Sequence, residues 1–298
     1  MKFSKISAYA LATVASLLTF EAIPATAQTS GFVYVATNQP SGNTVIQYQR
    51  AASGLLTRIS EISTGGKGGV GNGVGNLDPL GSQDSLISND TGSLLLVVDA
   101  GSNQLSSVSA GSAGMHLLSV VGSGGTFPNS VALNGTLVYV LNAQGTPNVT
   151  GFRVSSTGKL QAISGSRRNL PGGSTAAPHD IQFTPDGTRL VVTEGGTNQI
   201  DIFELANNGL ITSVTTQPST CSGPFGFRFG RQGVLLNSEA TSASVSSYSL
   251  TTGDTLTVIR AAVPDTQKAA CWMTLTGTAR VGFVSNTASG TISSKRIS

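Results

Sequence analysis

The sequence predicts an all-β fold, and within that class a β-propeller of four-stranded blades. Three observations support this prediction. The composition disfavours helices, a strand–turn–strand pattern recurs six times, and the spacing of its copies is typical of one propeller blade.

The composition comes first. Of the 298 residues, 37 are Gly and only 10% are charged, while Ser and Thr are abundant. Gly and the β-branched or hydroxylated residues are poor helix formers, whereas strands and turns accept them. A hydrophobic fraction of 39% is sufficient for a packed core, which argues against a disordered chain.

The repeat is the main observation. Each copy has an apolar strand, a polar or acidic residue, a turn, and a second, alternating strand. The copies span residues 33–49, 95–110, 138–154, 190–205, 234–250 and 281–297. Their strand-end residues are Asn38, Asp99, Asn142, Glu194, Glu239 and Asn286, which lie 61, 43, 52, 45 and 47 residues apart. This period is that of a four-stranded blade and indicates a propeller with six recognisable repeats.

The remaining strands of each blade are expected between these hairpins. Residues 180–183 precede the turn at 185–187 and are predicted to form an inner strand, while 160–163 and 256–259 are predicted outer strands. The first copy lacks a clear inner strand before Gly31, and the last ends before any outer strand. Two arrangements are compatible with this pattern: a six-bladed ring whose last blade is shared by the termini, or a seven-bladed chain shortened at its C-terminus. The abrupt end of the last copy favours the shortened chain.

The N-terminus predicts export. Lys2 and Lys5 precede a mostly apolar stretch at 6–20, and residues 25–27 (Ala-Thr-Ala) fit a cleavage site. We expect residues 1–27 to be a signal peptide and 28–298 to be the propeller domain, secreted or periplasmic. A membrane anchor is the alternative, but the apolar stretch is short for a span, so no membrane attachment is expected after cleavage.

Charge and cysteine content restrict the partners. The formal net charge is +3, and no basic cluster exceeds the pair Arg167–Arg168, which argues against nucleic-acid binding. No spacing of ligands indicates a metal site, and no cofactor is expected. Cys221 and Cys271 permit one disulfide in an oxidising compartment, or two separate buried thiols.

Several segments resemble one family. Residues 138–142 (VYVLN), 184–187 (TPDG), 224–227 (PFGF), 237–240 (NSEA) and 269–272 (AACW) are similar to segments of the lactonase-type seven-bladed propellers. That family includes propeller-type 6-phosphogluconolactonases and fungal 3-carboxymuconate lactonising enzymes (3-carboxymuconate cyclases). The resemblance covers most of 31–297 and points to the exported members. It implies hydrolysis or formation of a lactone of a small sugar acid or muconate-type acid.

The chain departs from the family pattern in two places. Family members continue for another blade after the segment that resembles 289–297, and they carry an aromatic residue at the position of Lys295. If the additional blade lines the central channel, the departure puts the activity in doubt.

His179 is the predicted general acid/base. It is one of two His and lies at the start of a predicted inner strand, and an ordinary His titrates near neutral pH. The phosphogluconolactonase-like members have a similar Pro-His segment. The alternative is a loop His that is merely hydrogen-bonded.

Glu239 and Glu194 end equivalent strands and are candidates for a second acid/base. In the fungal enzymes a Glu and an Arg accompany the His, which by resemblance assigns Glu239 and makes Arg228 the clamp for a substrate carboxylate. The alternatives are a solvated turn acid for Glu239 and a surface cation between two Phe for Arg228.

The glycine run at 65–73 includes Lys67 but lacks the Ser or Thr of a phosphate-binding loop. We expect a flexible loop that enters the channel, where Lys67 meets an anionic substrate. Two functions therefore stand: an exported lactonase or lactonising enzyme, and a non-catalytic exported propeller that binds a carbohydrate, a cell-wall component or a protein.

Overall fold

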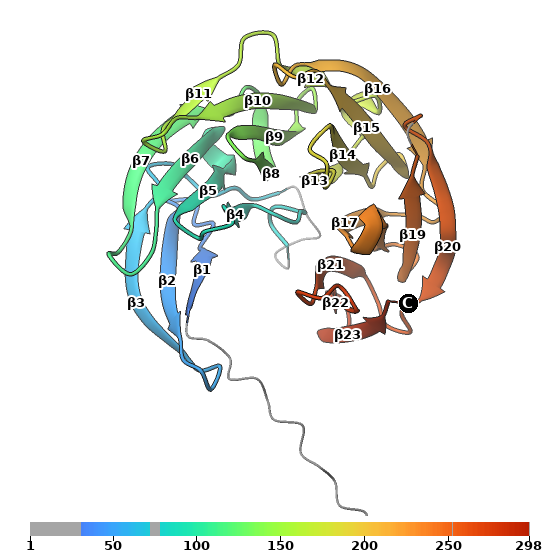
Figure 1. Cartoon of the computed structure of the whole chain (residues 1–298). Helices are drawn as coiled ribbons and strands as arrows, with labels where there is room; N and C mark the ends of the chain where they lie inside the picture. Colours follow the sequence, from blue (N-terminus) through green and yellow to red (C-terminus); the bar gives the residue numbers. More distant parts are fainter. Residues whose placement is uncertain (1–30, 72–77, 252, 298) are drawn as a thin grey trace, which may run out of the picture.

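A computed structural model describes residues 31–71, 78–251 and 253–297, so the predicted signal peptide at 1–27 lies outside the described residues. Within them, 23 strands form six antiparallel sheets that are arranged as blades around a central axis (Figure 1). Helix is limited there to three single 3₁₀ turns. The predicted fold class is confirmed.

The blades follow one another in chain order. Blade 1 comprises β1 (Gly31–Ala36), β2 (Thr44–Arg50) and β3 (Leu56–Ser63); blade 2 comprises β4 (Leu86–Ser88), β5 (Leu94–Asp99), β6 (Gln104–Ser109) and β7 (His116–Gly122). Blade 3 comprises β8 (Thr126–Asn134), β9 (Leu137–Gln144), β10 (Asn148–Val154), β11 (Leu160–Ala162) and the short β12 (Arg168–Asn169). Blade 4 comprises β13 (Pro178–Phe183), β14 (Arg189–Glu194), β15 (Gln199–Leu205) and β16 (Ile211–Pro218). Blade 5 comprises β17 (Pro224–Phe229), β18 (Leu235–Glu239), β19 (Ser244–Leu250) and β20 (Leu256–Pro264), and blade 6 comprises β21 (Ala270–Leu275), β22 (Val281–Asn286) and β23 (Thr291–Arg296).

The repeat copies are the paired second and third strands in blades 2 to 6, and β1 and β2 in blade 1. The predicted inner strand at 180–183 lies within β13, and the predicted outer strands at 160–163 and 256–259 correspond to β11 and β20. In blades 2 to 5 the first strand in the sequence lies nearest the axis and the fourth forms the rim (Figure 1).

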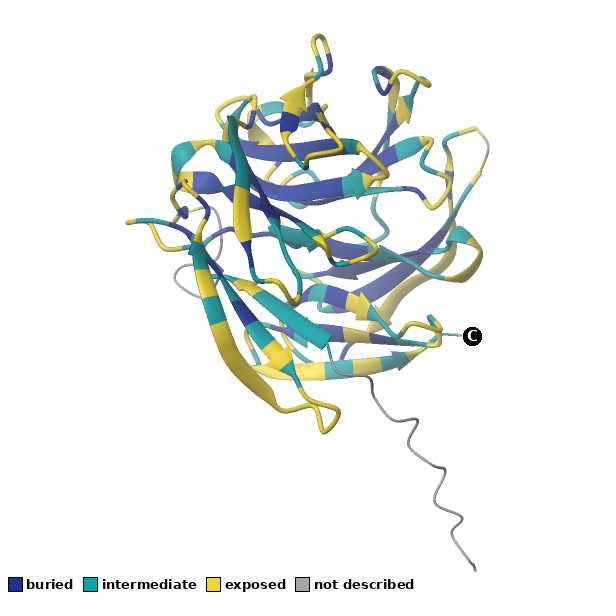
Figure 2. Cartoon of the chain, turned by 60° about the vertical axis from the view of Figure 1, so that its left-hand side comes forward, coloured by how far each residue is buried: buried dark blue, intermediate teal, exposed yellow. Residues whose placement is uncertain are grey.

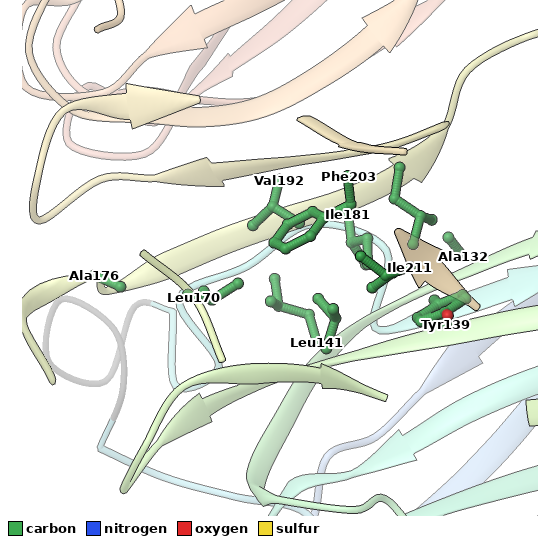
Figure 3. Close-up of a cluster of buried hydrophobic side chains, with 11 residues drawn as sticks. Ala132, Tyr139, Leu141, Leu170, Ala176, Ile181, Val192, Phe203 and Ile211 are labelled. Atoms are coloured by element: carbon green, nitrogen blue, oxygen red, sulfur yellow. The ribbon is translucent and has the colours of Figure 1, made fainter. Parts of the chain in front are cut away.

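The core lies between neighbouring blades. Leu141 on β9 packs with Ile181, Val192 and Phe203 of blade 4 in one cluster of fully buried side chains (Figure 3). Because the middle strands of the blades are buried on both faces, their sequences are nearly continuous apolar runs. The rim strands β3 and β20 are mostly exposed, as Figure 2 shows.

An open sector separates blade 6 from blade 1 (Figure 1). Each of these two sheets has three strands, and no strand ladder joins them within the described residues. Among the described residues, blade 1 has no strand inside β1, and blade 6 has none outside β23. Residues 31–297, apart from the undescribed 72–77 and 252, therefore do not form the shared closing blade that the sequence left open as one alternative.

Two further features concern the cysteines and the helices of the described residues. Cys221 and Cys271 are free thiols, the first half-buried and the second buried, so the permitted disulfide is absent. None of the helices in the described part of the chain is long and apolar enough to cross a membrane.

Candidate active site

A short segment contacts the innermost strands of four blades. Residues 81–84, called here the central strap, precede β4 and bond to the first strands of blades 3 to 6. Ser82 donates its hydroxyl to the carbonyl of Asn129 on β8 at 2.7 Å, and accepts from the indole of Trp272 on β21 at 2.7 Å. The amide of Gln83 donates to the carbonyl of His179 on β13 at 2.9 Å. The strap therefore links blades whose residues lie far apart in the sequence.

The side chain of Gln83 fixes the strap at its middle. Its amide nitrogen donates to Asp180 at 2.9 Å and to the carbonyl of Phe227 at 3.0 Å. Its oxygen accepts the backbone N–H of Met273 at 2.7 Å. Because Gln83 is buried and bonded on both sides, the strap is a well-defined part of the core.

An ion pair lies beside Gln83. Arg228 on β17 donates two parallel hydrogen bonds to Asp84, at 2.8 and 2.6 Å, the bidentate geometry that gives strong Arg–carboxylate pairs. The buried carboxyl of Asp180 lies 3.9 Å from the same guanidinium. Burial, followed by the charge of Asp84, raises the pKa of Asp180, although Arg228 opposes this rise. The cluster therefore holds one cation between two acids, of which Asp180 tends to keep its proton.

The backbone at Asp84 is unusual. Its φ of 60° lies in the left-handed region, which Asp and Asn tolerate better than other non-glycine residues. This conformation belongs to the strap, and it places the carboxylate against Arg228 with part of its surface still open.

A cavity of about 490 Å³ adjoins this pair, between blade 1 and blade 6. Its walls are formed mainly by Tyr34, Leu86, Trp272, Met273, Phe283 and Ile292. Asp84 and Arg228 are the charged residues among the described side chains that line it. The volume falls within the range of small-molecule sites, roughly 300–1,000 Å³. A polar pair in a largely apolar cavity is the usual arrangement of such a site.

His179 lies outside this cavity. Its Nδ1 contacts the carbonyl of Gly81 at 2.5 Å, and because a carbonyl only accepts, Nδ1 carries the proton. Its ring stacks on Phe225 with centroids 4.3 Å apart, and Nε2 faces Gly195, where a Cβ would overlap it. Burial lowers the pKa of His179 to about 4, so the ring is neutral at pH 7. These contacts match the hydrogen-bonded alternative, and the catalytic role stays a prediction.

Glu194 and Glu239 lie inside the blades. Five strand-end residues of the repeat are at most 1% exposed: Asp99, Asn142, Glu194, Glu239 and Asn286. The first four each bond to the segment that leaves the preceding blade. The pairs are Thr64 with Asp99 at 2.6 Å, Ser123 with Asn142 at 3.2 Å, Gly172 with Glu194 at 3.1 Å, and Ser219 with Glu239 at 2.6 Å. We call these contacts the inter-blade latches. Glu239 is therefore not the solvated turn acid of the alternative interpretation.

Two buried acids near the latches, Glu239 and Asp201, have raised pKa values. Burial raises the pKa of Glu239 to about 7, against smaller opposing effects of its hydroxyl and amide partners. Burial and the neighbouring Glu194 raise the pKa of Asp201. Neither Glu194 nor Glu239 lines the cavity. Their proposed acid/base role thus stays a prediction, and their visible role is to join neighbouring blades.

Lys67 is exposed and does not line the cavity. Its amide donates to the Ser102 hydroxyl at 2.9 Å, and its carbonyl accepts from Gly101 at 3.0 Å. The neighbouring Gly66 packs against the carboxyl of Asp99 so closely that a Cβ would overlap it. Residues 66–69 are thus packed against the neighbouring blades and do not form a loose loop, whereas 70–71 are exposed and 72–73 lie outside the described residues. The contact of Lys67 with an anionic substrate stays a prediction.

The structure thus brings Arg228 alone, of the five predicted site residues, to the cavity. Sequence reasoning missed Asp84, Gln83 and Trp272 as its neighbours. One signal was available: Asp84 is one of only 14 acids in the chain and follows a Gly-Ser-Gln segment that fits no strand pattern.

Fold and site together define a β-propeller with a polar cluster beside a cavity of small-molecule size. The sequence model of the family described as "Lactonase, 7-bladed beta-propeller" matches residues 86–236, half of the chain. The chain belongs to this lactonase family of β-propellers. No match was found among the curated proteins.

Solved structures share the fold. The periplasmic gluconolactonase of Pseudomonas aeruginosa is 14% identical, with 90% of this chain and 82% of that chain covered and a TM-score of 0.68. A proposed 6-phosphogluconolactonase of Bacteroides uniformis is 19% identical, with 89% and 81% covered and a TM-score of 0.64. Virginiamycin B lyase of Staphylococcus aureus is 15% identical, with 90% of this chain and 89% of that chain covered and a TM-score of 0.53. At such identities the likeness shows the fold alone.

Proposed function

We propose that the chain is a lactonase that hydrolyses a small lactone in the cavity beside Arg228 and Asp84. The observation that carries this proposal is the bidentate Arg228–Asp84 pair in the wall of a cavity of about 490 Å³, in a propeller of the lactonase family. The pair supplies a carboxylate and a fixed cation, which are the two groups that ester hydrolysis needs.

The chemistry follows from these two groups. The Asp84 carboxylate accepts a proton from a water molecule, whose oxygen attacks the lactone carbonyl carbon. The guanidinium of Arg228 stabilises the negative charge that develops on the carbonyl oxygen. The ring C–O bond then breaks, and Asp84 returns its proton to the leaving ring oxygen. Lactone and water become the open hydroxy acid, and Asp84 is restored.

The surroundings support this assignment. Asp180 lies behind the guanidinium and Gln83 bonds to Asp180, so Arg228 is held from the side away from the cavity. Trp272 is fixed by its bond to the strap and presents an aromatic wall to the cavity. Groups held in this way act without reorganisation during the reaction.

The test uses the substitution Asp84→Asn. Asn has nearly the same shape and tolerates the left-handed backbone, so the fold is retained while the base is lost. Lactone hydrolysis followed by pH-stat should fall at least about 100-fold in kcat/KM, the usual contribution of a general base. Asp90→Asn, at an exposed turn, makes the same charge change and should leave the rate unchanged. Unaltered turnover by folded Asp84→Asn would refute the assignment.

A non-catalytic binding propeller is the second candidate. It is favoured by one observation: the side chains of His179, Glu194 and Glu239 do not meet Arg228 at the cavity. If no lactone is turned over while calorimetry detects binding of a carbohydrate or cell-wall fragment, this second function is the correct one.

Export is part of either proposal. It is supported by the sequence of residues 1–27 and tested by N-terminal sequencing of the protein recovered from its native host. A mature chain that begins at Gln28 supports export, whereas an intact N-terminus contradicts it.

A further inference from the structure

The charges around the cavity restrict what it can bind. The lining contains one cation, Arg228, and one acid, Asp84, and they already pair with each other through both guanidinium–carboxylate bonds. Asp180 adds a second acid 3.9 Å from the same guanidinium. An anionic substrate that replaced Asp84 on Arg228 would lie next to the displaced carboxylate, and one that bound the remaining guanidinium N–H groups would lie next to the paired carboxylate. Like charges at such short range disfavour binding.

The larger part of the remaining wall is apolar and partly exposed, and the other lining residues are uncharged polar ones: Ser82, Gln83, Ser85, Thr274 and Ser285. Val35 on β1 is 44% exposed, and Phe283 on β22 and Ile292 on β23 are 39% and 73% exposed. Trp272, Met273 and Leu86 extend this surface inward to the strap. A ligand that covers these side chains gains affinity in proportion to the apolar area that it buries.

We infer that this site takes an uncharged lactone with an apolar ring or alkyl substituent, and disfavours phosphorylated or carboxylated lactones. The inference rests on the proposed function, because it specifies the substrate class of the same cavity. It departs from the sugar-acid and muconate-type substrates expected from the family resemblance. The reason is that the clamp expected for a substrate carboxylate, Arg228, is occupied by a carboxylate of the chain itself.

The first experiment compares two lactones on the full chain. Dihydrocoumarin is neutral and aromatic, whereas 6-phosphogluconolactone carries a phosphate. We expect kcat/KM for dihydrocoumarin to exceed that for the phosphorylated lactone at least tenfold. A preference for the phosphorylated lactone overturns the inference but leaves the lactonase function intact. If neither lactone is hydrolysed, the proposed function fails, and binding then decides the inference.

The second experiment measures binding by calorimetry, with dihydrocoumarin and with 6-phosphogluconate as the anionic probe. Asp84→Asn frees the guanidinium of Arg228, so affinity for 6-phosphogluconate should rise at least tenfold over the unmodified chain. Asp90→Asn removes the same charge from an exposed turn and should show no such gain. The inference would be overturned if both variants gained equal affinity for 6-phosphogluconate. It would also be overturned if the unmodified protein bound 6-phosphogluconate as tightly as dihydrocoumarin.

Discussion

Replacing Glu239 by Gln should stabilise the protein at alkaline pH and leave lactone turnover unchanged. Glu239 is fully buried in an inter-blade latch and accepts a hydrogen bond from Ser219 at 2.6 Å. Burial raises the pKa of its carboxyl from 4.5 to about 7. In the unfolded chain the carboxyl ionises near 4.5, whereas in the folded chain it keeps its proton until about pH 7.

The direction of the pH dependence follows from this difference. Stability contributed by protonated Glu239 is complete below about pH 4.5 and is lost as the pH rises through about 7. One pKa unit corresponds to about 1.4 kcal/mol, so the rise of the Glu239 pKa to about 7 amounts to roughly 3 kcal/mol. Gln is neutral at every pH and can still accept from Ser219. The unfolding free energy of the variant should therefore equal that of the unmodified protein near pH 4.5. At pH 8 it should be higher by up to roughly 3 kcal/mol.

The assay is urea denaturation at pH 4.5 and pH 8, together with lactone turnover. Glu204→Gln provides the matched control, because it is the same substitution on an exposed strand position of blade 4. A Glu239→Gln variant that loses turnover while its stability is unchanged would refute the latch interpretation and restore Glu239 as a catalytic acid/base.

Three further predictions concern packing, the cavity and the thiols. Gly66→Ala should lower the unfolding free energy by about 1–3 kcal/mol, because a Cβ there overlaps Asp99. Gly42→Ala, where a Cβ would meet open space, is the control, and equal urea midpoints for the two variants would contradict the close packing. Trp272 is the only Trp of the chain and lines the cavity, so dihydrocoumarin should change its fluorescence saturably; hydrolysis without any change would place the site elsewhere. Thiol titration in denaturant without reductant should count two free thiols, with Cys221 reacting before Cys271 in the folded protein, and a count of zero would reveal a disulfide.

Much of the architecture could be predicted because it repeats. The strand-end residues Asp99, Glu194 and Glu239 mark equivalent positions in their blades, and the structure places them at equivalent positions in space. Their burial was not predictable from spacing alone. A polar residue at a strand end is compatible with a channel-facing group and with a latch. The two differ only in whether the residue contacts the segment that leaves the preceding blade.

The site was harder to predict because it is assembled from distant segments. Asp84 and Arg228 are 144 residues apart in the sequence. Asp84 lies in a strap with a left-handed backbone, outside every repeat copy, so no periodic pattern marks it. His179 was correctly placed at the start of an inner strand, but its side chain turns to the Gly81 carbonyl and Phe225. That contact depends on the strap, which local sequence does not reveal.

The most direct measurement of the central claim compares Asp84→Asn with His179→Gln on the same neutral lactone, with folding of both variants checked by circular dichroism. The cavity assignment predicts that Asp84→Asn loses at least about 100-fold in kcat/KM while His179→Gln, if folded, retains most of it. A loss confined to His179→Gln would contradict the cavity assignment and move the chemistry to the half-buried His179 on β13.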